Sequence, residues 1–405
     1  MKSRFLTSIP AGVAAAAVLT AGQALHATDP NRAPLAPSER TAVLALLDAV
    51  DAVQQGRVAA DESVRWESHV LKSSVMTAYV PFEMSLDTLP TALKSGALYV
   101  RAVTRPRPPQ VAEQHSEVRA WIQGGAATAT RLGDSVYMPQ GGMPIGGPAM
   151  TSGKRNISVP GESAVKLRAI EQDTENQRAE DARKARKERD ASLFPFEEYY
   201  FFDGKASRAA GPRRIARALA LPRGEYELYV ALLDRGHIKD AKPVVVSRTV
   251  TVPDFWNDEL RLSSVILTND VRILKAPFAE EARIEHPYAF GLAEPAIRLA
   301  REFSTGDVLS IVYQICNYGA PDADLSADYS FYRMDNGPRK YFNGTKPQPL
   351  GDDDLPTPSL LGTQAFAMQS VPLAAFPPGR YELEITVHDR LTRAIAKTVA
   401  GFSVR

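Results

Sequence analysis

The chain has 405 residues, a length that favours two domains over one core. Its net charge of +1 excludes the strongly basic character of a nucleic-acid-binding protein, and 30 prolines and 26 glycines favour turns and short strands over long helices. Because Cys316 is the only cysteine, an intrachain disulfide is excluded and we expect a small buried side chain in a strand.

The first residues have the pattern of a secretory signal peptide, 1–27. Lys2 and Arg4 precede an apolar stretch from Ile9 to Ala24, and "ALHA" ends at Ala27 with small residues suited to cleavage. Removal of 1–27 changes the net charge from +1 to −1. We therefore expect a secreted or periplasmic protein with no stable membrane span after signal cleavage; a signal retained as an anchor is the alternative.

Residues 28–60 are predicted to form a linker and one amphipathic helix. Apolar residues recur at helical spacing, and Ser38 and Gly56 are expected to begin and end the helix. The apolar positions are Val43, Leu46, Leu47, Val50 and Val53.

The first β-rich region, 61–254, is expected to contain an insertion at about 125–190. Strands are predicted within 64–87 and 96–106, and a further strand at 116–125. The insertion includes a Pro/Gly/Met loop at 137–150 and a stretch, 166–190, with eight basic and seven acidic residues and a helical or disordered pattern. The aromatic cluster at 194–202 indicates a strand buried on both faces, with a ligand platform as the alternative.

The second β-rich region, 259–405, shows alternation typical of strands. "VLSIVYQICNY" at 308–318 is strongly apolar, and Leu325, Ala327, Tyr329 and Phe331 fall on one side of the next strand. Asn-Gly occurs at 336–337 and 343–344 and predicts hairpin turns. The short linker "DFWND" suggests that Phe255 or Trp256 lies between the two domains.

One segment occurs twice, as "LPRGEYELYVALLDR" at 221–235 and "FPPGRYELEITVHDR" at 376–390. Seven of the fifteen aligned positions are identical, including Gly224 with Gly379 and Tyr226 with Tyr381. Pro and Gly predict a tight corner, after which Tyr and Leu alternate toward one face of a strand. Each tyrosine is placed so that its ring packs inside while its hydroxyl returns to the corner backbone.

This repeat resembles the end of bacterial immunoglobulin-like and fibronectin-III-like β-sandwiches, in which a tyrosine corner precedes the penultimate strand. The N-terminal part, with "YVPFEMSLD" and then "ALYVRAV", also resembles uncharacterised secreted bacterial proteins with two sandwiches. The resemblance implies a mainly β protein with two immunoglobulin-like antiparallel sandwiches, an N-terminal helix and the charged insertion in the first. It implies no activity, because such sandwiches host many functions.

No residue pattern selects a catalytic, cofactor or metal site. The chain contains no G-x-S-x-G, H-E-x-x-H or paired cysteines, and its histidines are scattered singly. His388 replaces Leu233 in the repeat, which favours a surface strand position. The acidic loops "PDADLSAD" (321–328) and "GDDDLP" (351–356) offer oxygen ligands for calcium but are more typical of solvated loops.

The sequence thus favours a secreted, non-catalytic β-sandwich protein that binds, adheres or scaffolds at the cell envelope. Its expected partner is a protein or an envelope polymer, and no cofactor or nucleic acid is predicted. The alternative is a secreted hydrolase, or an accessory module of one, with a site near the insertion of the first domain.

Overall fold

The computed structural model describes residues 35–73, 76–86, 95–106, 118–119, 122, 195–203, 214–237, 242–319, 323–334, 338–350 and 363–405. The predicted signal peptide, the loop at 137–150 and the insertion at 125–190 lie outside these ranges. Among the helices described, none combines the length and the apolar character needed to cross a bilayer.

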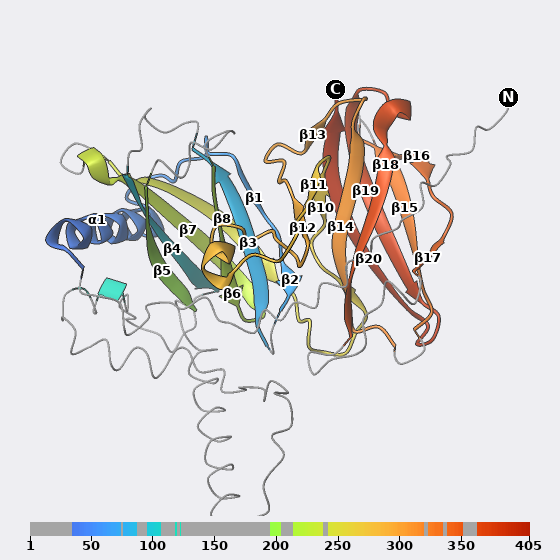
Figure 1. Cartoon of the computed structure of the whole chain (residues 1–405), viewed down its shortest axis with the longest axis horizontal. Helices are drawn as coiled ribbons and strands as arrows, with labels where there is room; N and C mark the ends of the chain where they lie inside the picture. The colour runs from blue at the N-terminus through green and yellow to red at the C-terminus, as the bar shows by residue number, and fades with distance from the viewer. Residues whose placement is uncertain are drawn as a thin grey trace, which may run out of the picture.

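Two antiparallel β-sandwiches lie side by side (Figure 1). In one sheet of the first sandwich, β3 (Ala78–Ser85) pairs on one side with β1 (Trp66–Ser68) and β2 (Leu71–Lys72) and on the other with β6 (Arg214–Leu221). The facing sheet has the order β5 (Phe196–Asp203), β4 (Ser95–Arg105), β7 (Gly224–Asp234), β8 (Val244–Val252). The short 3-10 turn η2 (Arg235–His237) follows β7.

The second sandwich repeats this plan. In one sheet, β14 (Val308–Cys316) pairs with β9 (Arg261–Leu262) and β10 (Ile266–Thr268) on one side and with β18 (Gln364–Pro372) on the other. The facing sheet has the order β13 (Glu302–Phe303), β20 (Ala394–Val404), β19 (Gly379–Asp389), β15 (Leu325–Arg333), β16 (Lys340–Gly344), with β17 (Gln348–Leu350) also on β15. A small hairpin, β11 (Val271–Ile273) with β12 (Ala293–Pro295), encloses the short helix α5 (Glu280–Arg283), and η4 (Leu373–Ala375) follows β18.

The two quoted repeats occupy the same position in the two sandwiches. β7 lies between β4 and β8, and β19 lies between β15 and β20, and in chain order each repeat is the penultimate strand of its own sandwich. This common strand order, with all sheets antiparallel apart from the short β13–β20 contact, identifies the fold as mainly β with two immunoglobulin-like sandwiches. The predicted fold class is confirmed.

Both tyrosine corners are present. The Tyr226 hydroxyl donates to the Pro222 carbonyl (2.8 Å), and the Tyr381 hydroxyl donates to the Pro377 carbonyl (2.6 Å). Gly224 has φ 149°, and a Cβ added to it would lie 3.0 Å from the Tyr226 hydroxyl oxygen. A glycine is therefore required where the corner backbone passes the phenol.

Helix α1 (Pro37–Gln54) covers the outer face of one sheet of the first sandwich (Figure 1). Leu46 and Leu47 are fully buried in a cluster with Tyr99, Tyr229 and other residues of β4, β5, β7 and β8. Arg101, also fully buried, points from β4 to the helix and pairs with Asp51 (2.6 Å) and with Glu197 of β5 (3.2 Å). On the equivalent face of the second sandwich no described helix covers the sheet, and polar side chains of β19 lie there beside the exposed Ile395 and Val399 of β20.

Three local predictions were wrong. The helix has Ala36 at its N-cap and Pro37 at its first position, so Ser38 lies inside the first turn; the Ala36 N–H donates to the Glu39 carboxylate (3.1 Å). Residues 118, 119 and 122 are helical instead of extended, because Val118 and Ile122, four apart, both pack into the cluster beneath α1. Asn343-Gly344 ends strand β16 and forms no hairpin turn.

Candidate functional site

The two sandwiches are joined by a hydrogen-bonded seam along β2, the short edge strand of the first sandwich. The buried Gln314 side chain accepts from the Lys72 N–H (2.7 Å) and donates to the Lys72 carbonyl (3.2 Å), so its amide acts like a neighbouring strand. Two residues away, Val70 and Ser264 exchange two bonds of 2.9 and 3.0 Å. Backbone groups on this part of the edge are therefore satisfied across the seam instead of by water.

Two tyrosines cross the seam in opposite directions. Tyr79 of β3 donates its hydroxyl to the Pro287 carbonyl (2.8 Å), and Tyr288 donates to the Pro81 carbonyl (3.0 Å). Tyr288 is 2% exposed and belongs to an apolar cluster between the sandwiches with Leu71, Ile266, Phe290, Ile297 and Val312. Burial raises the pKa of Tyr288 well above its ordinary value.

A buried histidine lies at the centre of the seam. Nδ1 of His69 is 2.9 Å from the Tyr288 hydroxyl, and Nε2 is 3.6 Å from the Glu67 carboxylate, which itself pairs with Arg301 of the second sandwich. Burial, reinforced by the Arg301 charge, lowers the pKa of His69 to about 3. The imidazole is therefore neutral at physiological pH, and this arrangement depends on it remaining so.

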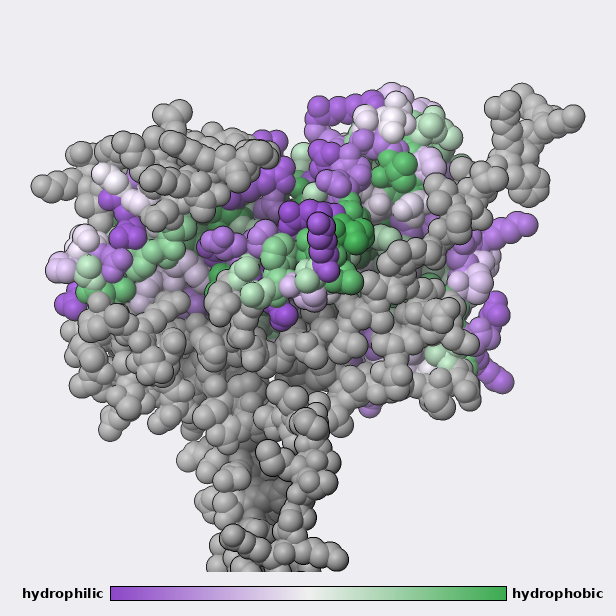
Figure 2. Space-filling model, viewed as in Figure 1, coloured by the Kyte–Doolittle hydropathy of each residue, from purple (hydrophilic) through white to green (hydrophobic). Residues whose placement is uncertain are grey.

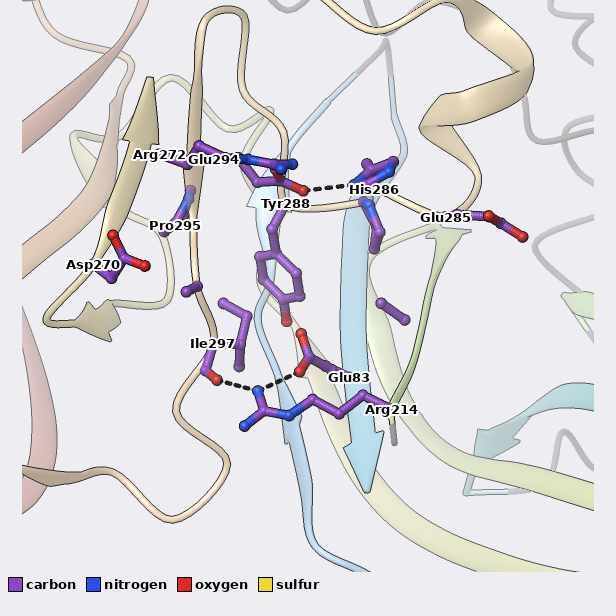
Figure 3. Close-up of a pocket in the computed structure, with 13 residues that line it drawn as sticks. Glu83, Arg214, Asp270, Arg272, Glu285, His286, Tyr288, Glu294, Pro295 and Ile297 are labelled. Carbon is purple, nitrogen blue, oxygen red and sulfur yellow. Dashed lines mark hydrogen bonds and ion pairs between the residues drawn. The ribbon is translucent and has the colours of Figure 1, made fainter. Parts of the chain in front are cut away.

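A hollow of about 330 Å³ opens beside the seam, between the first sandwich and the β11–β12 hairpin (Figure 3). β3 and β6 supply its inner wall, and the chain from 270 to 297 supplies its outer wall. Hydrophilic residues lie beside hydrophobic ones along the region where the sandwiches meet (Figure 2). The hollow is lined by Glu83, Arg214, Ala216, Asp270, Arg272, Glu285, His286, Pro287, Tyr288, Glu294, Pro295, Ala296 and Ile297.

On the inner wall, Arg214 links the two sandwiches. Its Nη1 donates to the Glu83 carboxylate (2.6 Å) and to the Ile297 carbonyl (2.6 Å), as the dashed lines of Figure 3 show. Burial raises the pKa of Glu83, although the bond to Arg214 opposes this effect. The Arg214–Glu83 ion pair fixes the two side chains of the inner wall, and the Glu83 carboxylate is hydrogen-bonded to Arg214.

On the outer wall, Glu294 holds two partners. It pairs with Arg272 across the β11–β12 hairpin, and its second oxygen is 2.7 Å from Nδ1 of His286. The His286 ring stacks on Phe278 with centroids 4.0 Å apart, and Arg272 lies over the same Phe278 ring at 5.8 Å. His286 is therefore oriented by a carboxylate on one side and an aromatic ring on the other.

The hollow is suited to polar recognition. Its lining contains four carboxylates, two guanidinium groups and one imidazole, but no serine, threonine or cysteine among the residues described. Both guanidinium groups and two of the carboxylates are paired within the wall. A ligand would meet an ordered set of charges without a serine, threonine or cysteine nucleophile, and the one hydroxyl in the lining, that of Tyr288, is bonded to the Pro81 carbonyl.

A second polar surface covers the outer face of strands β19, β15 and β16. Arg339 stacks on Tyr332 at 3.6 Å and pairs with Glu382 (3.0 Å) and Glu384 (2.8 Å). Tyr341, 64% exposed, contacts Tyr332 edge to face. His388 lies on this face and pairs with Asp328 at 3.0 Å, so the predicted surface position of His388 is confirmed, whereas Leu233 of the first repeat is buried beneath α1.

Other predicted candidates have structural roles. Cys316 is fully buried in β14, and burial raises the pKa of its thiol to about 12. Phe196 and Tyr200 point into the first core while Tyr199 packs beneath α1, so β5 is buried on both faces as expected. Phe255 is fully buried and shares a cluster with Cys316, at the junction of the sandwiches.

The acidic loops receive no support as cation sites. The loop at 351–356 lies outside the described residues, and in the described part of 321–328 Asp324 and Asp328 face Arg390 and His388. Across the described ranges, no cluster of three or more His, Cys, Asp or Glu side chains could hold a metal ion.

The hollow is the feature that the sequence did not reveal. Its residues come from positions 83, 214–216 and 270–297, which lie far apart in the chain until the seam brings them together. The one local signal is the polar cluster at 285–288, Glu-His-Pro-Tyr, in which every residue lines the hollow.

Comparison with known proteins adds no family. No family model and no curated protein matches the chain. Among solved structures, an immunoglobulin-like protein from Pseudomonas aeruginosa is 14% identical over 35% of this chain and 97% of its own, with a TM-score of 0.17. Red sea bream transglutaminase is 8% identical over 88% of this chain and 33% of its own, with a TM-score of 0.18. A structure described as BspA_C_mut is 12% identical over 84% of this chain and 98% of its own, with a TM-score of 0.16. At these TM-scores the fold assignment rests on the strand order and the two tyrosine corners, and the comparisons assign no activity.

Proposed function

We propose that this protein is a secreted, non-catalytic β-sandwich protein that binds, adheres or scaffolds at the cell envelope. The observation that carries the proposal is the charged hollow between two sandwiches that a hydrogen-bonded seam holds together. Binding sites are frequently found where two domains meet, because both contribute polar groups to one concave surface.

The pairing of charges in the hollow favours recognition over catalysis. A general acid or base needs freedom to exchange its proton with a substrate. Glu83 is held by Arg214, and Glu294 by Arg272 and His286. These groups present fixed charge to a ligand, a role that suits a polar polymer or a protein surface.

The localisation part of the proposal draws on the predicted signal peptide, 1–27. Export would place the hollow where envelope polymers and other exported proteins are encountered. Mass determination of the mature N-terminus and fractionation of the producing cell would test it; an intact N-terminus in a cytoplasmic fraction would contradict it.

A retention assay tests the binding role. Purified protein is passed over insoluble envelope polymers and over immobilised exported proteins, and the bound fraction is measured. Arg272→Glu reverses a charge in the hollow, and Arg390→Glu is the matched control at a turn remote from the hollow, since both arginines are exposed (56% and 64%) and each pairs with one acid. We expect retention to be lost only in Arg272→Glu. Equal retention of the two variants would show that the hollow is not the binding site.

A hydrolase is the alternative, and the His286–Glu294 pair is the observation that favours it. A histidine oriented by a carboxylate can act as a general base toward water. The predicted location near the 125–190 insertion lies outside the described residues, so the hollow is the place to test. Substrate turnover that disappears in His286→Ala while folding is retained would replace the binding role with hydrolysis.

A further inference from the structure

Strand β20, at one edge of the larger sheet of the second sandwich, has an open stretch. On one side it pairs with β19 along its whole length, from Ala394 to Val404. On the other side, within the described chain, it pairs only with β13, at Ser403 and Val404, while β9 of the facing sheet lies close to it without pairing. The strand is regular, and neither proline nor a bulge interrupts it; of the residue-level protections common at sheet edges it carries one lysine, Lys397.

The direction of the unpaired backbone groups follows from the bonds to β13. The Ser403 N–H donates to the Arg301 carbonyl (3.0 Å), and the Arg405 N–H donates to the Phe303 carbonyl (2.8 Å). Because alternate residues of a strand direct their N–H and C=O groups to the same side, residues 401, 399, 397 and 395 present theirs at the open edge. No backbone bond to these groups is formed by any described residue outside the strand.

The side chains beside this edge are apolar with one charge between them. Ile395 and Val399 are 59% and 56% exposed, and Lys397 lies between them with its amine 3.3 Å from Glu384. A strand that pairs here would cover both apolar side chains and satisfy the backbone groups.

We propose that residues 395–401 pair with the same residues of a second copy of this chain, in an antiparallel, two-fold arrangement that joins two sheets into one. Self-pairing that uses all four open residues has a single symmetric register, centred on Thr398. It sets Ile395 opposite Gly401 of the second copy and Lys397 opposite Val399 of the second copy. The inference does not depend on the proposed function.

Charge and shape both favour this register. In the proposed register Lys397 lies opposite the aliphatic Val399 of the second copy. A shift of the register by two residues would place the two Lys397 side chains directly opposite each other, and like charges in that position destabilise a sheet. β13 already pairs with β20 beyond Phe402, so no partner strand can pair there. In the symmetric register the partner's β20 ends at this point, because the residues that would lie opposite 403 and 404 belong to the partner's turn at 390–393.

Cross-linking tests the two-fold centre. In the proposed register the two Thr398 residues form a pair without mutual backbone bonds, at a Cα separation of about 4.5 Å that a disulfide can span. Thr398→Cys should form a disulfide-linked dimer under mild oxidation. The native Cys316 is fully buried and should not compete. Ile395→Cys is the control, because its two copies lie at opposite ends of the paired stretch and should remain unlinked.

A charge pair tests the register even if Thr398→Cys fails to fold. Val399→Lys places a lysine opposite each Lys397 of the dimer and should weaken the dimer about tenfold, whereas Val399→Glu should tighten it. Met368→Lys, at a half-exposed position of the other sheet, should leave the mass unchanged. Masses are measured by light scattering over a dilution series. A monomer at every concentration, or equal effects of Val399→Lys and Val399→Glu, would overturn the proposal.

Discussion

At the scale of single residues, the tyrosine corners link the sequence repeat to stability. Tyr226→Phe and Tyr381→Phe keep the ring but leave the Pro222 or Pro377 carbonyl without its hydroxyl donor. Each change should lower the free energy of unfolding by about 1 kcal/mol. Urea denaturation monitored by fluorescence measures this, with Tyr341→Phe, at a 64% exposed position, as the control. A loss as large in the control as in the corner variants would show that the corner bonds contribute nothing.

These corners were predictable because every part of them is local. Proline, glycine and tyrosine lie within five residues of one another, and the hydroxyl returns to a carbonyl four residues upstream. The N-cap of α1 was also local but was misassigned, because a proline at the first helical position determined the start of the helix more strongly than Ser38 did.

At the scale of elements, the two repeats differ because one sheet is covered by a helix and the other is open. Leu233 of β7 is buried beneath α1, and the aligned His388 of β19 lies on the open face, paired with Asp328. The outward side chains of β7 are apolar at Tyr229, Ala231 and Leu233, whereas those of β19 at the aligned positions are Glu384, Thr386 and His388. The helix thus accounts for the divergence of two otherwise similar strands.

Exchange of these residues tests this explanation. Leu233→His would bury a polar ring beneath α1 and should cost about 3 kcal/mol of folding free energy. His388→Leu removes one partly exposed hydrogen bond, to Asp328, and should change stability by less than about 0.5 kcal/mol. Chemical denaturation of both variants gives the two values. Similar losses of folding free energy in both variants would mean that the cover of α1 does not decide whether a polar side chain is accepted on the outer face of the sheet.

The helical residues 118, 119 and 122 show why the type of an element was mispredicted where the pattern is short. Two apolar residues four apart fit a helix, but the stretch is too brief for its period to be distinguished from a strand by pattern alone. Its apolar side faces α1 and Tyr199, partners that lie far away in the sequence. Tertiary contact, which the local sequence does not encode, decided its conformation.

At the scale of the molecule, the position of one sandwich on the other could not be predicted. The seam depends on the Gln314 side-chain amide, which bonds the backbone N–H and C=O of Lys72. It also depends on the hydroxyls of Tyr79 and Tyr288, each of which donates to a backbone carbonyl of the other sandwich. Each of these residues is ordinary within its own strand or loop, and the contacts join positions more than 200 residues apart. The hollow has the same non-local origin, because its lining comes from three separate parts of the chain, and only the run at 285–288 gives a local signal of it.

The buried His69 makes this seam sensitive to acid. Its pKa is lowered from 6.5 to about 3 in the folded protein, so the unfolded chain binds a proton first as the pH falls through 6.5. The stabilisation by neutral His69 is therefore complete above pH 6.5 and is progressively lost toward pH 3. Glu67, Arg301 and Tyr288 face the ring. Burial raises the pKa of Glu67, which opposes the loss of stability at low pH only in the acidic range where carboxylates bind protons.

Between about pH 7 and about pH 5, His69 should therefore reduce the free energy of unfolding by about 2 kcal/mol. Urea denaturation across this range measures the slope. His69→Asn keeps a donor near the Tyr288 hydroxyl but removes the titrating ring, so its stability should be lower at neutral pH and nearly independent of pH over the same interval. A variant that retains the slope of the native protein would show that acid sensitivity originates elsewhere, and that the seam tolerates a charge on His69.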